Sequence, residues 1–112
     1  MSSALHEFEW SCEEVQKRLS ADGPPKLIDC REPSEFALVH LDDAELIPMN
    51  DTPSRLDDYR AGAGPTVVYC HHGVRSLQVV AWLRSQGVED VWSMAGGIDH
   101  WSLTVDPSKP RY

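Results

Sequence analysis

The most informative part of this chain is the stretch Thr66-Val67-Val68-Tyr69-Cys70-His71-His72-Gly73-Val74-Arg75-Ser76. Its first four residues are β-branched or aromatic, which is typical of a buried strand. An apolar pattern with helical spacing runs from Ser76 to Gln86, and Gly87 is placed to end that helix. The stretch therefore predicts a strand, a short loop and a helix, with Cys70 at the carboxyl end of the strand.

The loop after Cys70 has the features of an anion-binding site. Its backbone N–H groups can converge on one centre, and the following helix directs its positive dipole end there. Gly73 allows the positive φ of a tight curl, Arg75 adds a positive charge and Ser76 caps the helix. These features favour a thiolate at Cys70. The alternative, a buried cysteine that merely closes the strand, leaves the placement of Gly73 and Arg75 unexplained.

Composition limits the possible functions. The 112 residues suit one domain, residues 1–112, and the net charge of −8 argues against a nucleic-acid partner or an anionic membrane surface. No apolar run approaches the length of about 18 residues that a membrane-spanning helix needs, and the first residues lack the pattern of a secretion signal. Three cysteines do not make a disulfide framework, so we expect a reducing, cytoplasmic location.

Short apolar runs alternate with helical patterns along the rest of the chain. We expect further strands at 26–30, 45–48 and 91–94, helices at 11–20, 34–39, 51–59 and 98–101, and an extended tail at about 105–112. Such alternation predicts an α/β fold, with a parallel sheet between helices on both faces. Sites in such sheets form at the carboxyl ends of strands, where both Asp29 and Cys70 are expected.

Four motifs in order resemble those of the rhodanese-like sulfurtransferase family. They are the cysteine loop Cys70–Ser76, the segment Asp29–Phe36, the segment His40–Pro48 and the ending Ala95–Trp101. The resemblance implies a five-stranded parallel sheet flanked by helices, and a Cys70 that carries sulfur as a persulfide. It implies no metal and no organic cofactor.

The length of the loop separates two chemistries that such a cysteine could perform. Four residues lie between Cys70 and Arg75, one fewer than in the phosphate-binding loop of cysteine phosphatases. A shorter loop encloses less space above the sulfur, which suits one transferred sulfur atom better than a phosphoryl group.

The chain departs from the family pattern at three positions. Val39 and Asp43 stand where the family usually has glycine, so we expect the backbone to adjust at these turns. His71 replaces the arginine or lysine of some members that use thiosulfate. A neutral imidazole binds a sulfonate less well than a guanidinium does, which weakens the expectation of strong thiosulfate:cyanide activity.

The resemblance assigns roles to the loop and to its neighbours. We expect substrate contacts or loop-holding contacts from the residues that follow the cysteine: His71, His72, Gly73, Val74, Arg75 and Ser76. Arg75 is expected to brace the loop against acidic residues rather than to touch the substrate. One expectation is that Asp29 caps a turn and Arg31 forms a salt bridge. The other is that the two residues hold the cysteine loop in place or set the electrostatic field at the sulfur.

Two other possibilities remain open for the side chains near Cys70. A metal site at His71 and His72 is disfavoured, because adjacent residues in a tight loop rarely converge on one ion. Cys30 either resolves a persulfide on Cys70 as a disulfide or faces a helix and is inert.

The leading hypothesis is a sulfurtransferase that works by double displacement through Cys70. Its partners would be a small sulfur-containing anion and a thiophilic acceptor, which is cyanide, a thiol or a sulfur-carrier protein. The tail at 105–112 resembles the ending of rhodanese domains fused to adenylating enzymes, which points to a protein acceptor. The alternatives are a non-catalytic or redox-sensing module and, with less support, a cysteine phosphatase or arsenate reductase.

Overall fold

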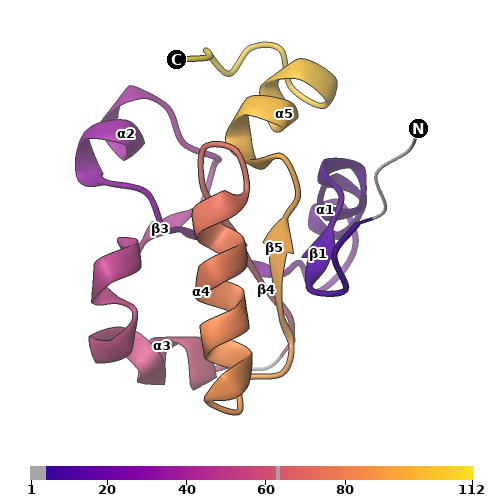
Figure 1. Ribbon diagram of the computed structural model, residues 1–112. Coiled ribbons are helices and arrows are strands. Elements are labelled where there is room, and N and C mark those ends of the chain that lie inside the picture. Colours follow the sequence, from indigo (N-terminus) through magenta and orange to yellow (C-terminus); the bar gives the residue numbers. More distant parts are fainter. Residues whose placement is uncertain (1–4, 63) are drawn as a thin grey trace.

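A computed structural model describes residues 5–62 and 64–112. The chain forms one five-stranded sheet in the order β1-β5-β4-β2-β3, and every pair of neighbouring strands is parallel (Figure 1). The strands are β1 (Glu9–Trp10), β2 (Lys26–Asp29), β3 (Glu45–Leu46), β4 (Thr66–Tyr69) and β5 (Val91–Met94). The helices are α1 (Cys12–Leu19), α2 (Pro33–Leu38), α3 (Leu56–Arg60), α4 (Val74–Ser85) and α5 (Gly97–Thr104), with 3₁₀ turns η1 (Met49–Asp51) and η2 (Pro53–Arg55) before α3. The predicted five-stranded parallel sheet is therefore confirmed.

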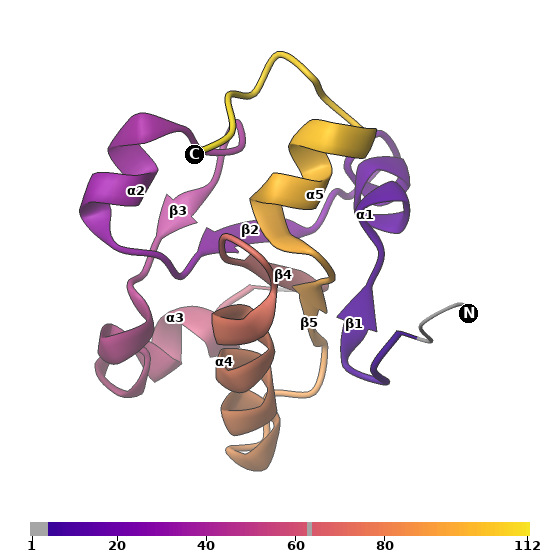
Figure 2. The ribbon, with the colours of Figure 1, turned by 45° about the horizontal axis from the view of Figure 1, so that its top comes forward.

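The helices cover both faces of the sheet, as predicted (Figures 1 and 2). On one face, α3 and α4 pack on alternate residues of the central strands, with Val80 and Leu83 of α4 against Ile28 and Val68. On the other face, α1 and α5 cover the strand residues that point the opposite way: Leu27, Val67 and Tyr69. The small helix α2 buries no residue in the core and lies beside the carboxyl ends of β2 and β3 (Figure 2).

The boundaries differ from the predicted ones in a few places. Strand β1 was not predicted, because two residues are too short to show a pattern. Helix α4 begins at Val74, two residues earlier than predicted, and the segment expected as one helix at 51–59 is split into η2 and α3. The tail was expected to be extended, but it makes a turn at residues 106–109 before it continues to Tyr112.

The two positions that lack the usual glycine behave differently. Asp43 has φ of +65°, so it adopts the left-handed conformation that glycine favours. Val39 has φ of −164° and ψ of 142°, which is ordinary extended backbone. Only one of the two expected backbone adjustments is therefore present. Among the described residues, no helix is both long and apolar enough to cross a membrane.

Helix α5 holds the start of the cysteine loop. Its Ile98 N–H donates to the Cys70 carbonyl at 2.9 Å, and its Asp99 N–H donates to the His71 carbonyl at 3.1 Å. Gly97, with φ of +65°, lies directly beneath these carbonyls, so that a Cβ there would be 2.4 Å from each oxygen. The loop and the helix can approach this closely only because residue 97 has no side chain.

This contact predicts that Gly97→Ala is much more harmful than an alanine at another left-handed glycine. Gly87 has φ of +89° with nothing within 4 Å of a built Cβ, so Gly87→Ala should cost about 1–2 kcal/mol through its backbone conformation alone. Gly97→Ala carries the same cost and also pushes the loop away from α5, which adds roughly 1–3 kcal/mol. Urea unfolding of both variants measures the difference, and equal losses would show that the close approach is unimportant.

Candidate active site

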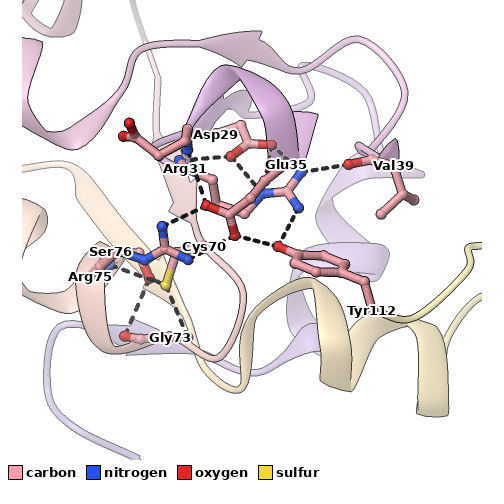
Figure 3. Close-up of polar contacts among 10 residues, drawn as sticks. Asp29, Arg31, Glu35, Val39, Cys70, Gly73, Arg75, Ser76 and Tyr112 are labelled. Atoms are coloured by element: carbon pink, nitrogen blue, oxygen red, sulfur yellow. Dashed lines mark hydrogen bonds and ion pairs between the residues drawn. The ribbon is translucent and has the colours of Figure 1, made fainter. Parts of the chain in front are cut away.

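Cys70 lies at the bottom of the loop between β4 and α4 and is only 1% exposed. Its Sγ accepts hydrogen bonds from the Gly73 N–H at 3.1 Å and the Ser76 N–H at 3.4 Å, and the Ser76 hydroxyl lies 3.4 Å away (Figure 3). Gly73 has φ of +95°, which turns its N–H toward the sulfur. A second hydroxyl, that of Ser93 on β5, hydrogen-bonds with Ser76 at 2.8 Å and holds it in place.

These contacts stabilise a negative charge on Cys70. The neighbouring Cys30 thiol, the Ser76 hydroxyl and the two backbone N–H groups together lower the pKa of Cys70 to about 5, although burial opposes this. The same interaction, together with burial, raises the pKa of the Cys30 thiol. At neutral pH the site therefore pairs a Cys70 thiolate with a Cys30 thiol.

The position of Cys30 follows from the strand register. Asp29 of β2 pairs with Tyr69 of β4, so the next residues, Cys30 and Cys70, leave neighbouring strands side by side. Both pack in the core cluster on the α4 face of the sheet. Cys30 therefore lies beside Cys70 and also faces the helices on this side of the sheet.

The charge state of Cys70 predicts a titration that can be measured without any substrate. The ultraviolet absorbance of the thiolate should appear as the pH rises through about 5, and disappear below it as the sulfur is protonated. Cys12 should not contribute up to pH 8, because burial raises its pKa to about 12. Cys70→Ser should abolish the step and Cys12→Ser should retain it. A midpoint near 8.5, the usual value for a thiol, would contradict this assignment.

Asp29 and Arg31 form an ion pair with both side chains fully buried. The Arg31 guanidinium donates to both carboxylate oxygens of Asp29 at 2.6–3.1 Å, and Asp29 also accepts from the Arg31 N–H at 2.9 Å. Arg31 donates further to the Val39 carbonyl. Asp29 thus caps the turn after β2, while Arg31 ties that turn to the end of α2.

Arg75 points from the loop toward α2, where Glu35 binds its guanidinium at 2.8 and 3.0 Å (Figure 3). The hydrogen bonds from Arg75, and one from the Tyr112 hydroxyl, lower the pKa of the Glu35 carboxyl to about 2. This geometry is that of a brace between the loop and α2. The sequence analysis expected an acidic partner for Arg75 but did not say which residue it would be.

The two histidines stack on one another at the mouth of the loop, with ring centroids 3.9 Å apart. Asp99 of α5 completes a group in which one possible ligand atom from each residue lies within 4.8 Å of the others. Sequence reasoning did not foresee this proximity. However, both carboxylate oxygens of Asp99 already bind Arg111, so a cation would have to displace that arginine. Val74, also in the loop, is two-thirds exposed.

Sequence reasoning missed Tyr112. Its hydroxyl accepts from Arg31 at 2.7 Å and donates to Glu35 at 2.6 Å, and its ring stacks on His71 at 4.0 Å (Figure 3). From the sequence, the tail at 105–112 indicates only a protein acceptor and no contact with the site. No local pattern in the sequence connects a tyrosine at residue 112 with Arg31 or Glu35.

The family described as Rhodanese-like domain matches residues 11–104 of this chain. The chain belongs to the rhodanese-like domain family.

Two relatives illustrate the range of the family. The thiosulfate sulfurtransferase GlpE of Pseudomonas fluorescens is 36% identical over 78 residues, covering 70% of this chain and 71% of that protein. The Rhodanese-like/PpiC domain-containing protein 12, chloroplastic, of Arabidopsis thaliana is 40% identical over 90 residues. That match covers 78% of this chain but only 30% of the plant protein, so the chain spans less than a third of that relative.

Solved structures show the same fold. The human single-domain sulfurtransferase TSTD1 has a TM-score of 0.75 at 26% identity, covering 88% of this chain and 98% of that chain. A rhodanese-like domain protein from Staphylococcus aureus has a TM-score of 0.77 at 27% identity, and the match covers 91% of this chain and 95% of that chain.

Proposed function

We propose that this protein is a sulfurtransferase that carries a sulfane sulfur as a persulfide on Cys70. The observation that carries the proposal is the loop geometry, in which two N–H groups and a hydroxyl surround a buried sulfur whose pKa is lowered to about 5. A thiolate is the nucleophile that sulfur transfer requires. The relatives named as sulfurtransferases support the same reaction class.

The reaction is a double displacement in which the sulfur atom changes partner twice. The Cys70 thiolate attacks the outer sulfur of thiosulfate, a new S–S bond forms, the S–S bond of thiosulfate breaks, and sulfite leaves with the bonding electrons. An acceptor such as cyanide then attacks the outer sulfur of the persulfide, releasing thiocyanate and regenerating the Cys70 thiolate. The loop N–H groups stabilise the negative charge at each stage.

The choice of donor depends on His71. Burial and the neighbouring His72 lower the pKa of His71, so its imidazole is neutral at pH 7 and offers no charge to a sulfonate. Arg75 is occupied by Glu35 and Arg31 by Asp29. We therefore propose that thiosulfate is a weak donor and that a persulfide, which lacks a sulfonate, is a better one.

The proposed acceptor in the cell is a thiol or a sulfur-carrier protein. The probable adenylyltransferase/sulfurtransferase MoeZ of Mycobacterium tuberculosis is 34% identical over 91 residues, although this chain covers only 22% of it. The likeness of residues 105–112 to the ending of such fused domains points the same way. The net charge of −8 offers no surface for nucleic acid, and the three unpaired cysteines suit a reducing compartment such as the cytoplasm.

The proposal predicts that the protein gains the mass of one sulfur atom on incubation with thiosulfate or with a cysteine-derived persulfide. Cyanide should then remove this sulfur as thiocyanate. Cys70→Ser should gain nothing, whereas Cys12→Ser, which removes a buried thiol on α1, should behave as the unaltered protein does. Intact-mass measurement follows the adduct. Absence of an adduct with both donors would reject sulfur transfer, and hydrolysis of an aryl phosphate would favour a phosphatase instead.

A redox-sensing function is the second candidate, and the adjacency of Cys30 and Cys70 favours it. Peroxide would oxidise the Cys70 thiolate to a sulfenic acid, and the Cys30 sulfur would displace hydroxide from it to form a disulfide. Mild peroxide should then give a Cys30–Cys70 disulfide, read by peptide mapping, that is absent from Cys30→Ser. Over-oxidation of Cys70 with no disulfide would exclude the redox-sensing function. That result would not count against the proposal that the protein transfers sulfur.

A further inference from the structure

The C-terminal tail, residues 105–112, crosses from α5 to α2 over the end of the sheet that carries the cysteine loop (Figure 2). Three contacts hold it there. Lys109 pairs with Asp42 at 3.0 Å, Arg111 pairs with Asp99 of α5 at 2.7 Å, and Tyr112 reaches the group around Arg31. The tail is therefore part of the structure around the site.

The hydroxyl of Tyr112 links two ion pairs, Asp29–Arg31 and Glu35–Arg75. It accepts from Nη1 of Arg31, a side chain with no exposed surface whose other bonds go to Asp29 and Val39. It donates to Oε2 of Glu35, the same oxygen that binds Nη2 of Arg75. A continuous series of hydrogen bonds thus runs from the end of β2, through the tail, to the cysteine loop (Figure 3).

The ring of Tyr112 covers the first residue of the loop after the cysteine. It lies parallel to the His71 ring, with an angle of 8° between them and 4.0 Å between centroids, and His72 stacks on His71 as well. The other charged groups around His71 are Asp99 of α5 and Glu35 of α2. Among the described residues, Nε2 of His71 is buried without a hydrogen-bond partner, while the ring packs between those of Tyr112 and His72.

We propose that Tyr112 is a positioning residue for the reaction at Cys70. Its hydroxyl holds the Glu35–Arg75 brace on the buried Asp29–Arg31 pair, and its ring keeps His71 packed and shielded from water. The expected effect of Tyr112 on the reaction rate rests on the proposed sulfur transfer. The structural consequence of the proposal, the environment of His71, is independent of any activity.

The hydroxyl is tested by Tyr112→Phe, which keeps the ring on His71. The variant loses the two hydrogen bonds that the hydroxyl makes to the charged side chains of Arg31 and Glu35. We expect kcat for persulfide-to-cyanide transfer to fall roughly threefold to tenfold, with KM little changed, because the groups that brace the loop and not the substrate lose contacts. In a Glu35→Gln background the same change should cost almost nothing further, since the brace is already broken. Glu14→Gln, which alters an exposed ion pair with Arg18 on α1, should leave turnover unchanged.

If the fold-losses in kcat of Tyr112→Phe and Glu35→Gln multiply in the double variant, the two residues act independently, and the link through Glu35 is overturned. An unchanged kcat in Tyr112→Phe would also overturn it.

The ring is tested by Tyr112→Ala through the NMR titration of the His71 imidazole. Burial and the neighbouring His72 lower the pKa of His71 in the unaltered protein, so removal of the Tyr112 ring should raise the pKa of His71 toward its ordinary value. Tyr112→Phe should leave it unchanged. The same His71 pKa in the unaltered protein, Tyr112→Phe and Tyr112→Ala would overturn the inference that the Tyr112 ring shields His71 from water. Because this titration needs no substrate, it would still test the placement of Tyr112 if sulfur transfer itself failed.

Discussion

The site depends on the two hydrogen bonds that the first turn of α5 gives to the cysteine loop. Ile98 and Asp99 bind the carbonyls of Cys70 and His71 from outside, so the following N–H groups are free to turn inward toward the sulfur. A helix start usually needs capping groups for its unpaired N–H groups, and here the loop supplies them. The same contacts thus complete α5 and shape the anion site, which explains why Gly97 lies where only glycine fits.

An acidic protein can hold a thiolate only if the charge is balanced locally. The two arginines near Cys70 do not provide a free positive charge, because Arg31 is paired with Asp29 and Arg75 with Glu35. The stabilisation comes instead from hydrogen bonds, donated by Cys30, Ser76 and the loop backbone. Such donors are weaker than a full charge but are fixed at short range in a buried place, where hydrogen bonds to an anion are worth most.

The local features of the site could be predicted from the sequence, and its long-range contacts could not. The strand, loop and helix that begin at Thr66 are each determined by residues close together in the chain. For this reason the sequence predicts both ends of β4 correctly and the start of α4 to within two residues. The brace joins residues 40 apart in the chain, and the link to the tail joins residues 81 apart. One sequence contains nothing that pairs such distant residues, and strand β1 is too short for its pattern to be seen.

The proximity of Cys30, which lowers the pKa of Cys70, also makes a Cys30–Cys70 disulfide a second reaction open to the site. The Cys30 thiol lowers the pKa of Cys70 by stabilising the thiolate while it keeps its own proton, and the same interaction raises the pKa of Cys30. A thiol is a poor nucleophile, which slows its attack on a persulfide or sulfenic acid at Cys70. Sulfur transfer is therefore favoured over disulfide formation for as long as the proton stays on Cys30.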